Sequence, residues 1–184
     1  GFDALKDFEP VSLVSQQEAI LSVTPNLPAK SVRDIIALSK AKPNSLNMAT
    51  AGIGSSSHLA GILFNSMASA LPHAKSGKLV MLATCGPSRS PLTPDMPTLT
   101  ESWPGYEVVT WYSIAAPAKT PRALVMRLNG DVNRVLANPD AVARFHAGGN
   151  TPAPSTPEAM HDYTRNEIEK FRKIIKSAGL RFDT

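Results

Sequence analysis

The chain has 184 residues, of which 42% are hydrophobic and 18% charged, as expected for a globular protein of one domain or two small ones. Its formal net charge of +4 comes from scattered basic residues and only 6% of residues are aromatic, so the composition argues against nucleic-acid binding. Cys85 is the only cysteine and no two of the four histidines are spaced i,i+4. An intrachain disulfide is therefore excluded, a metal site has little support, and no cofactor is expected.

Two short strands are predicted near the start, at residues 11–14 and 19–24, because both stretches are rich in Val, Leu and Ile. The polar residues 15–18 are expected to join them. Ser31 is a good N-cap for the next helix, which should stop before Pro43.

A strand over residues 46–50 is predicted to lead into a glycine-hinged turn and then a helix. The apolar stripe of that helix would be formed by Leu59, Ile62, Leu63 and Met67. A short helix over residues 69–76 ending at Gly77, and a buried strand over 78–84, are expected to follow.

The later part of the chain begins with a proline-rich loop over residues 87–104, then a strand over 108–116 with Trp111 and Tyr112 in its middle. These two aromatic residues could face a cleft, although strand aromatics more often belong to a core. Helix starts are expected at Thr120, Asn138 and Thr156, and the last helix should end at Gly179.

The turn after residue 49 has the features of an anion site. Gly52 and Gly54 allow the backbone to approach a ligand, and Ser55, Ser56 and Ser57 offer hydroxyl groups and free amides at the expected helix start. A plain connecting loop has the same local pattern. Neither named phosphate motif fits, because no Lys follows Gly54 at the required place and Ser57 stands where a third glycine would be. A small carboxylate is the better expectation.

Strands alternating with helices predict an α/β layer architecture with a mostly parallel sheet flanked by helices, while the last third of the chain should be helical. No segment is apolar over the 18 or more residues that a membrane span needs. The start of the chain lacks the pattern of a signal peptide, so we expect such a leader to have been removed or not included.

Six segments, in this order, resemble the tripartite tricarboxylate transporter receptors, also called Bug proteins, which are bacterial periplasmic solute-binding proteins. The segments are LKDFEPV (5–11), NMATAGIGSSSHLAG (47–61), LPHAKSGKL (71–79), SRSP (88–91) with PDMPT (94–98), PGYE (104–107) with AAP (115–117), and STPE (155–158).

The resemblance implies a two-lobed, periplasmic-binding-protein-like (type II) fold, here in a partial version, that closes on a small carboxylate such as a dicarboxylate, tricarboxylate or amino acid. It implies delivery of the solute to membrane transporter subunits or to a sensor protein, in the periplasm and without enzymatic activity. By position, the ligand residues would be Thr50, Ala51, Gly52, Gly54, Ser55, Ser56 and His58. His58 could equally be a helix-end or core histidine.

The chain also departs from the family pattern. Nothing corresponds to the segment that family members carry before Gly1, and a strand–helix–strand piece is expected to be missing near residue 68. The predicted division is a ligand-binding lobe over residues 1–116 and a C-terminal helical part of the other lobe over 117–184. Three explanations remain open: a truncated receptor, a natural short form that pairs with another copy, and a longer chain of which this sequence omits residues. If the sequence is complete, a homo-oligomer is expected.

The sequence leaves two other functions to consider, a hydrolase and a scaffold protein. A hydrolase would use one of residues 55–57 as nucleophile with His58 or His73 as base, but the G-x-S-x-G motif is missing and no Asp is placed to orient the histidine. A truncated family member could instead act as an interaction or scaffold protein without ligand binding. The sequence does not identify the ligand.

Overall fold

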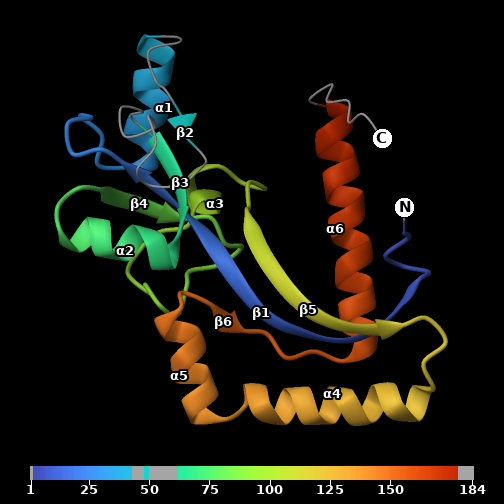
Figure 1. Cartoon of the computed structure of the whole chain (residues 1–184). Helices are drawn as coiled ribbons and strands as arrows, with labels where there is room; N and C mark the ends of the chain where they lie inside the picture. The colour runs from blue at the N-terminus through green and yellow to red at the C-terminus, as the bar shows by residue number, and fades with distance from the viewer. Residues whose placement is uncertain (1, 43–47, 50–61, 178–184) are drawn as a thin grey trace. The chain divides into compact units, whose positions relative to one another are not determined.

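The computed structural model describes residues 2–42, 48–49 and 62–177 (Figure 1). Two compact units are formed, one from Gly1–Ser15, Tyr112–Ala141 and Pro152–Thr184, and the other from Gln16–Trp111 and Val142–Thr151. We call these unit 1 and unit 2. The functional division between residues 1–116 and 117–184 stays a prediction.

The first strand, β1 (Phe8–Val23), is a single element of 16 residues. The prediction of two strands separated by residues 15–18 is therefore wrong. That polar stretch contains no Gly, Pro, Asn or Asp to break an extended backbone. In unit 2 the Ala19 N–H donates to the Val108 carbonyl at 3.2 Å, and the Ala19 carbonyl accepts from the Cys85 N–H at 2.8 Å. These hydrogen bonds hold the strand in place directly after the polar stretch.

The sheet of unit 2 has β1 at its centre. Strands β3 (Ile62–Ser66) and β4 (Val80–Thr84) both pair with β1 in antiparallel orientation, with Ile20 opposite Asn65 on one side and opposite Thr84 on the other. Strand β2 (Met48–Ala49) pairs with β3 in parallel. The sheet order is β2-β3-β1-β4, and β5 and β6 also pair with β1.

The expectation of a mostly parallel sheet is not met by these pairings. Strands β3 and β4, connected by a helix, do run in one direction, although β3 itself was not predicted as a strand. However, β1 lies between them and runs the opposite way. Local alternation constrains the direction of strands joined by a helix, but it does not say which distant strand is inserted between them.

Residues 62–66 form β3 and not the predicted helix, so the proposed apolar stripe through Ile62 and Met67 is wrong. Leu59 lies outside the described residues. Periodicity cannot distinguish a strand from a helix in such a short apolar run. Here the residues form a strand because they pair with β1. Helix α2 (Met67–Lys75) follows at once, with the Ser66 side chain accepting from the Ser69 N–H. The predicted end is confirmed, because Gly77 has a φ of +73°.

Helix α1 (Val32–Ala41) has the predicted N-cap, since the Ser31 side chain accepts a hydrogen bond from the Asp34 N–H. Its Val32 side chain joins the main apolar cluster of unit 2 with Leu21 and Val23 from β1 and Leu82 from β4. A second cluster contains Ile20 together with Met67 and Ala70 of α2. Both faces of β1 are therefore covered in this unit.

The remaining elements largely follow the prediction. They are α3 (Leu99–Ser102), β5 (Val109–Pro117), α4 (Arg122–Leu136), α5 (Pro139–Ala147), β6 (Thr151–Pro152) and α6 (Pro157–Ser177). The short elements α3 and β6 were not predicted. Pro121 is the N-cap of α4, one position earlier than the typical proline site. Gly179 lies outside the described residues.

Buried asparagine and serine side chains stabilise unit 1. The Asn129 amide of α4 donates to the carbonyl oxygens of Val11 and Ser155, both at 2.7 Å. The Ser155 hydroxyl accepts from the Leu13 N–H at 2.9 Å, and Ser12 Oγ lies 3.0 Å from Asn133 Oδ1. These contacts join β1, α4 and the segment before α6 within one unit.

Within the described ranges, every helix is too short or too polar to cross a lipid bilayer.

Candidate functional site

The predicted ligand turn lies outside the described residues. This applies to all seven of its predicted ligand residues, which are Thr50, Ala51, Gly52, Gly54, Ser55, Ser56 and His58. The structure describes β2, the strand that precedes the turn in sequence and ends at Ala49. The assignment of ligand contacts to the turn stays a prediction.

The carboxyl ends of three strands lie at one edge of the sheet in unit 2. Because Ala49 pairs with Leu63 in parallel, β2 and β3 end on the same side, and β4 runs in the same direction as β3. In open α/β sheets, ligands bind at this type of edge. A site should therefore be sought beside the last residues of β3 and β4.

A pocket of about 350 Å³ lies beside the last residues of β3, and it is large enough for a small solute. It is lined by Gln17, Glu18 and Ala19 of β1, Phe64, Asn65 and Ser66 of β3, and Tyr106, Val108 and Thr110. All of these residues belong to unit 2. Among the described residues, the lining carries one acidic residue and no basic one.

Two polar atoms in the pocket wall have no hydrogen-bond partner. They are Oε2 of Glu18 and Nδ2 of Asn65, and both are buried. Because Ile20 stands opposite Asn65 in the ladder, Glu18 is the diagonal neighbour of Asn65 on the same face of the sheet. Diagonal residues on neighbouring strands are about 7–8 Å apart, within reach of long side chains.

The carboxyl group of Glu18 is packed against the backbone of Gly86, directly after β4. A Cβ atom at position 86 would lie 2.6 Å from Cδ and 2.7 Å from Oε1 of Glu18. Burial raises the pKa of Glu18 above its usual value, and a hydrogen bond with the Ser90 side chain partly opposes this increase. The carboxyl group therefore lies against Gly86, and one of its oxygens is unsatisfied.

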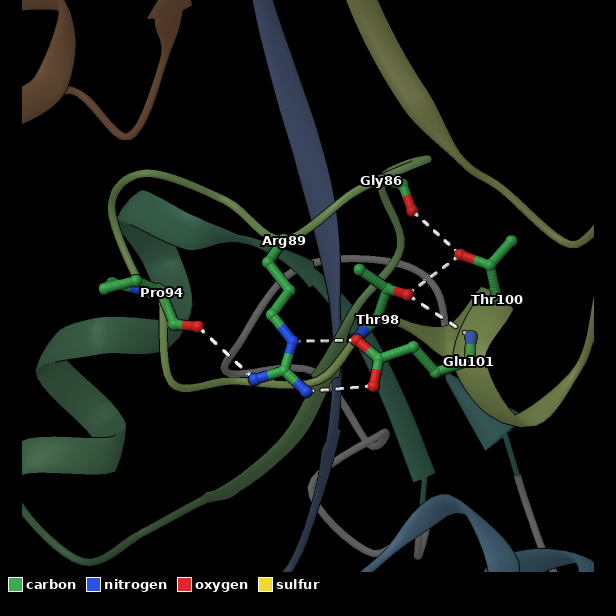
Figure 2. Close-up of polar contacts among 6 residues, drawn as sticks. All are labelled: Gly86, Arg89, Pro94, Thr98, Thr100 and Glu101. Atoms are coloured by element: carbon green, nitrogen blue, oxygen red, sulfur yellow. Dashed lines mark hydrogen bonds and ion pairs between the residues drawn. The ribbon is translucent and has the colours of Figure 1, made fainter.

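A hydrogen-bonded segment holds Gly86 in place, as Figure 2 shows. Thr100 Oγ1 lies within hydrogen-bonding distance of the Gly86 carbonyl oxygen at 3.2 Å and of Thr98 Oγ1 at 2.9 Å. Thr98 is the N-cap of α3 in a capping box with Glu101, whose carboxylate is bound by Arg89 through Nε at 2.8 Å and Nη2 at 2.9 Å. The Arg89 guanidinium is the main cause that lowers the pKa of Glu101.

Aromatic rings form another part of the wall. Phe64 and Tyr106 have ring centroids 6.5 Å apart, and Tyr106 stacks on Trp103 at 5.5 Å. Desolvation raises the pKa of the Tyr106 hydroxyl, with a smaller contribution from Cys85. Trp111 and Tyr112, the aromatic residues singled out from the sequence, do not line this pocket, and Tyr112 is half exposed. The ring faces can pack against the apolar body of a ligand.

Sequence reasoning missed Glu18, Asn65 and Tyr106 as site residues. Glu18 belonged to a stretch interpreted as a connection, and Asn65 to a segment interpreted as a helix. No local motif marks any of them, because they meet only through the pairing of β1 with β3 and the return of the chain at Val108.

The model of the tripartite tricarboxylate transporter family receptor matches residues 1–68 and 61–180. The chain belongs to this family. Its members are periplasmic solute-binding receptors and not enzymes, which confirms the resemblance seen in the sequence. The two matched ranges overlap at residues 61–68, next to the position where a missing internal piece is expected.

One curated relative is a UPF0065 protein from the tcbD–tcbE intergenic region of Pseudomonas sp. strain P51. It is 28% identical over 204 residues, covering 92% of this chain and 61% of the relative. The receptor chain thus spans less than two thirds of that relative. The alignment has more positions than the 184 residues of the chain, so the relative contains residues without a counterpart here.

Two solved structures share the fold. The structure of R. palustris Rpa4515 with adipate has a TM-score of 0.77 and 25% identity, covering 97% of this chain and 71% of that one. MatC from Rhodopseudomonas palustris with bound malate has a TM-score of 0.71 and 22% identity, covering 95% and 72%. The α/β architecture of a periplasmic binding protein is thereby established for this receptor chain.

Proposed function

We propose that this chain is a solute-binding receptor that captures a small carboxylate at the carboxyl edge of the unit 2 sheet. The observation that carries the proposal is the parallel pairing of Ala49 with Leu63. It places the end of β2, which directly precedes the predicted ligand turn, at the sheet edge where Phe64, Asn65 and Ser66 line the pocket.

In this proposal the amides and hydroxyls of the turn from Gly52 to Ser56 hold the ligand carboxylate through charge-assisted hydrogen bonds. The rest of the ligand occupies the pocket and packs against Phe64 and Tyr106. The relatives with adipate and with malate support a small carboxylate as the solute class. Delivery to a membrane transporter or a sensor in the periplasm follows the family and is proposed with it.

The test is a thermal shift with a panel of dicarboxylates, amino acids and their amides. Ligand at 100 times its Kd stabilises the native state by about 2.7 kcal/mol, which predicts a rise in Tm of roughly 5–10 °C for a chain of this size. The variant Gly54→Val should lose the rise, because its side chain blocks approach to the turn amides. Ser177→Ala, at an exposed position on α6, is the control and should keep it.

A second function is favoured by one observation, namely that the chain spans 61% of a curated relative. A receptor without part of its site could act as an interaction or scaffold protein. Absence of a shift with every solute in the panel would support this function and overturn the first. The expected homo-oligomer of the chain also stays a prediction, and light scattering with intact mass checks it.

A further inference from the structure

Two buried atoms of residues that line the pocket, Glu18 Oε2 and Asn65 Nδ2, have no hydrogen-bond partner and therefore indicate which groups a ligand should offer. A buried polar group without a partner costs roughly 1–3 kcal/mol, so such atoms are usually satisfied by a partner that the protein does not itself supply. Glu18 Oε2 is a hydrogen-bond acceptor when the carboxyl group is ionised, and Asn65 Nδ2 is a donor. They lie on diagonal residues of neighbouring strands.

A second carboxylate is a poor partner for this wall. It would be repelled by the Glu18 carboxylate, and the described residues that line the pocket include no Lys, Arg or His to compensate. An ammonium group would satisfy only Glu18, because it cannot accept from Asn65. A primary amide fits both atoms, since its NH₂ donates to Glu18 Oε2 while its carbonyl oxygen accepts from Asn65 Nδ2.

Each of the two atoms can reorient about a terminal torsion. Both are buried, and these torsions are χ3 of Glu18 and χ2 of Asn65. These torsions have broad minima, so a turn toward the cavity has a low energetic cost. The close approach to Gly86 keeps the rest of the Glu18 side chain at the cavity wall.

We propose that Glu18 and Asn65 together recognise a primary amide, so that the ligand class is a monoanion with a carboxylate at one end and an amide at the other. This inference rests on the proposed function, because the carboxylate end is assigned to the predicted turn. It assigns the uncharged end to residues that no sequence motif marks. Dicarboxylates of the same length are the disfavoured ligands.

The experiment compares near-isosteric pairs by isothermal titration calorimetry near neutral pH. The probes are succinate with succinamate, glutarate with glutaramate, and adipate with adipamate, so that chain length and amide character are separated. The proteins are the wild type, Glu18→Gln, and Glu169→Gln as a control that makes the same charge change at an exposed position on α6.

For the best-fitting length, the wild type should bind the amide roughly 10- to 100-fold more tightly than the dicarboxylate, as expected for a hydrogen bond to a charged group. Glu18→Gln should remove most of this preference, mainly by improving dicarboxylate binding, and Glu169→Gln should keep it. The preference is a ratio within one protein, so partial loss of folded material does not affect it.

Equal or tighter binding of the dicarboxylate by the wild type would overturn the inference while leaving the proposed receptor function intact. A preference for the amide that persists unchanged in Glu18→Gln would also overturn it. If none of the probes or other small carboxylates bind, the proposed function itself fails, and the inference fails with it.

Discussion

The carboxyl group of Glu18 fills the space that a side chain at position 86 would need. A Cβ on Gly86 would lie 2.6 Å from Glu18 Cδ. The nearest atoms belong to the end of a flexible side chain, so the strain of Gly86→Ala should be relieved by displacement of that carboxyl group. The two residues are thus coupled, although they lie on different segments of unit 2.

We therefore predict that Gly86→Ala lowers the free energy of unfolding by about 1 kcal/mol, at the low end of the cost of overpacking. In a Glu18→Ala background the same substitution should cost close to nothing, because the obstructing atoms are gone. Urea denaturation of the two single variants and the double variant measures this coupling. Additive costs would show that Gly86 is required for a reason other than the Glu18 contact.

The raised pKa of Glu18 predicts a pH-dependent stability difference. A carboxyl group whose pKa is higher in the folded than in the unfolded state favours folding below its unfolded pKa, and this contribution is lost as pH rises through the folded value. Glu18→Gln should therefore raise Tm at pH 7, by roughly 1–4 °C. The difference from the wild type should shrink as pH falls toward 4.5, the reference value of the group.

Tm measured from pH 4 to pH 8 for the wild type and Glu18→Gln checks this prediction. Glu169→Gln, which removes an exposed carboxylate, is the control and should show little change. A stabilisation by Glu18→Gln that grows toward acidic pH would have the wrong sign and would contradict the argument.

Asn129 should be among the most sensitive polar residues of unit 1. Its side-chain amide donates hydrogen bonds to the carbonyl oxygens of Val11 and Ser155, and the side chain is buried. Asn129→Ala leaves both carbonyl oxygens without this donor and is expected to cost roughly 2–3 kcal/mol, measured by urea denaturation. Arg127→Ala, at an exposed position of the same helix, should stay within about 0.5 kcal/mol of the wild type.

The capping box before α3 predicts a smaller effect. Thr98→Val keeps the shape of a buried side chain but removes the hydroxyl that accepts from the Glu101 N–H, so we expect a loss of about 1 kcal/mol. Because the same hydroxyl accepts from Thr100, which also bonds the Gly86 carbonyl, binding at the pocket should weaken as well (Figure 2).

Thr110→Val is the matched control for stability, since it makes the same chemical change at an exposed strand position where Val is favoured. Thermal denaturation of both variants gives the comparison. Equal Tm values for Thr98→Val and the wild type would mean that the capping box contributes nothing to the fold.

Sequence alone determined the features that depend on a residue and its near neighbours. The starts of α1, α5 and α6, the end of α2 at Gly77, and strands β4 and β5 were predicted within a few residues. In these cases a cap, a proline or a glycine acts on backbone groups only a few positions away. The family membership was likewise recognisable, because the sequence contains six segments that resemble family motifs in the same order.

Only the tertiary structure decided the features that depend on distant partners. Residues 62–66 are a strand because β1 pairs with them, and β1 is one strand because it pairs with β3, β4, β5 and β6. Its insertion between β3 and β4 made those pairings antiparallel. The pocket with Glu18, Asn65 and Tyr106 arises from the same pairings, and a local pattern contains no information about which strands meet.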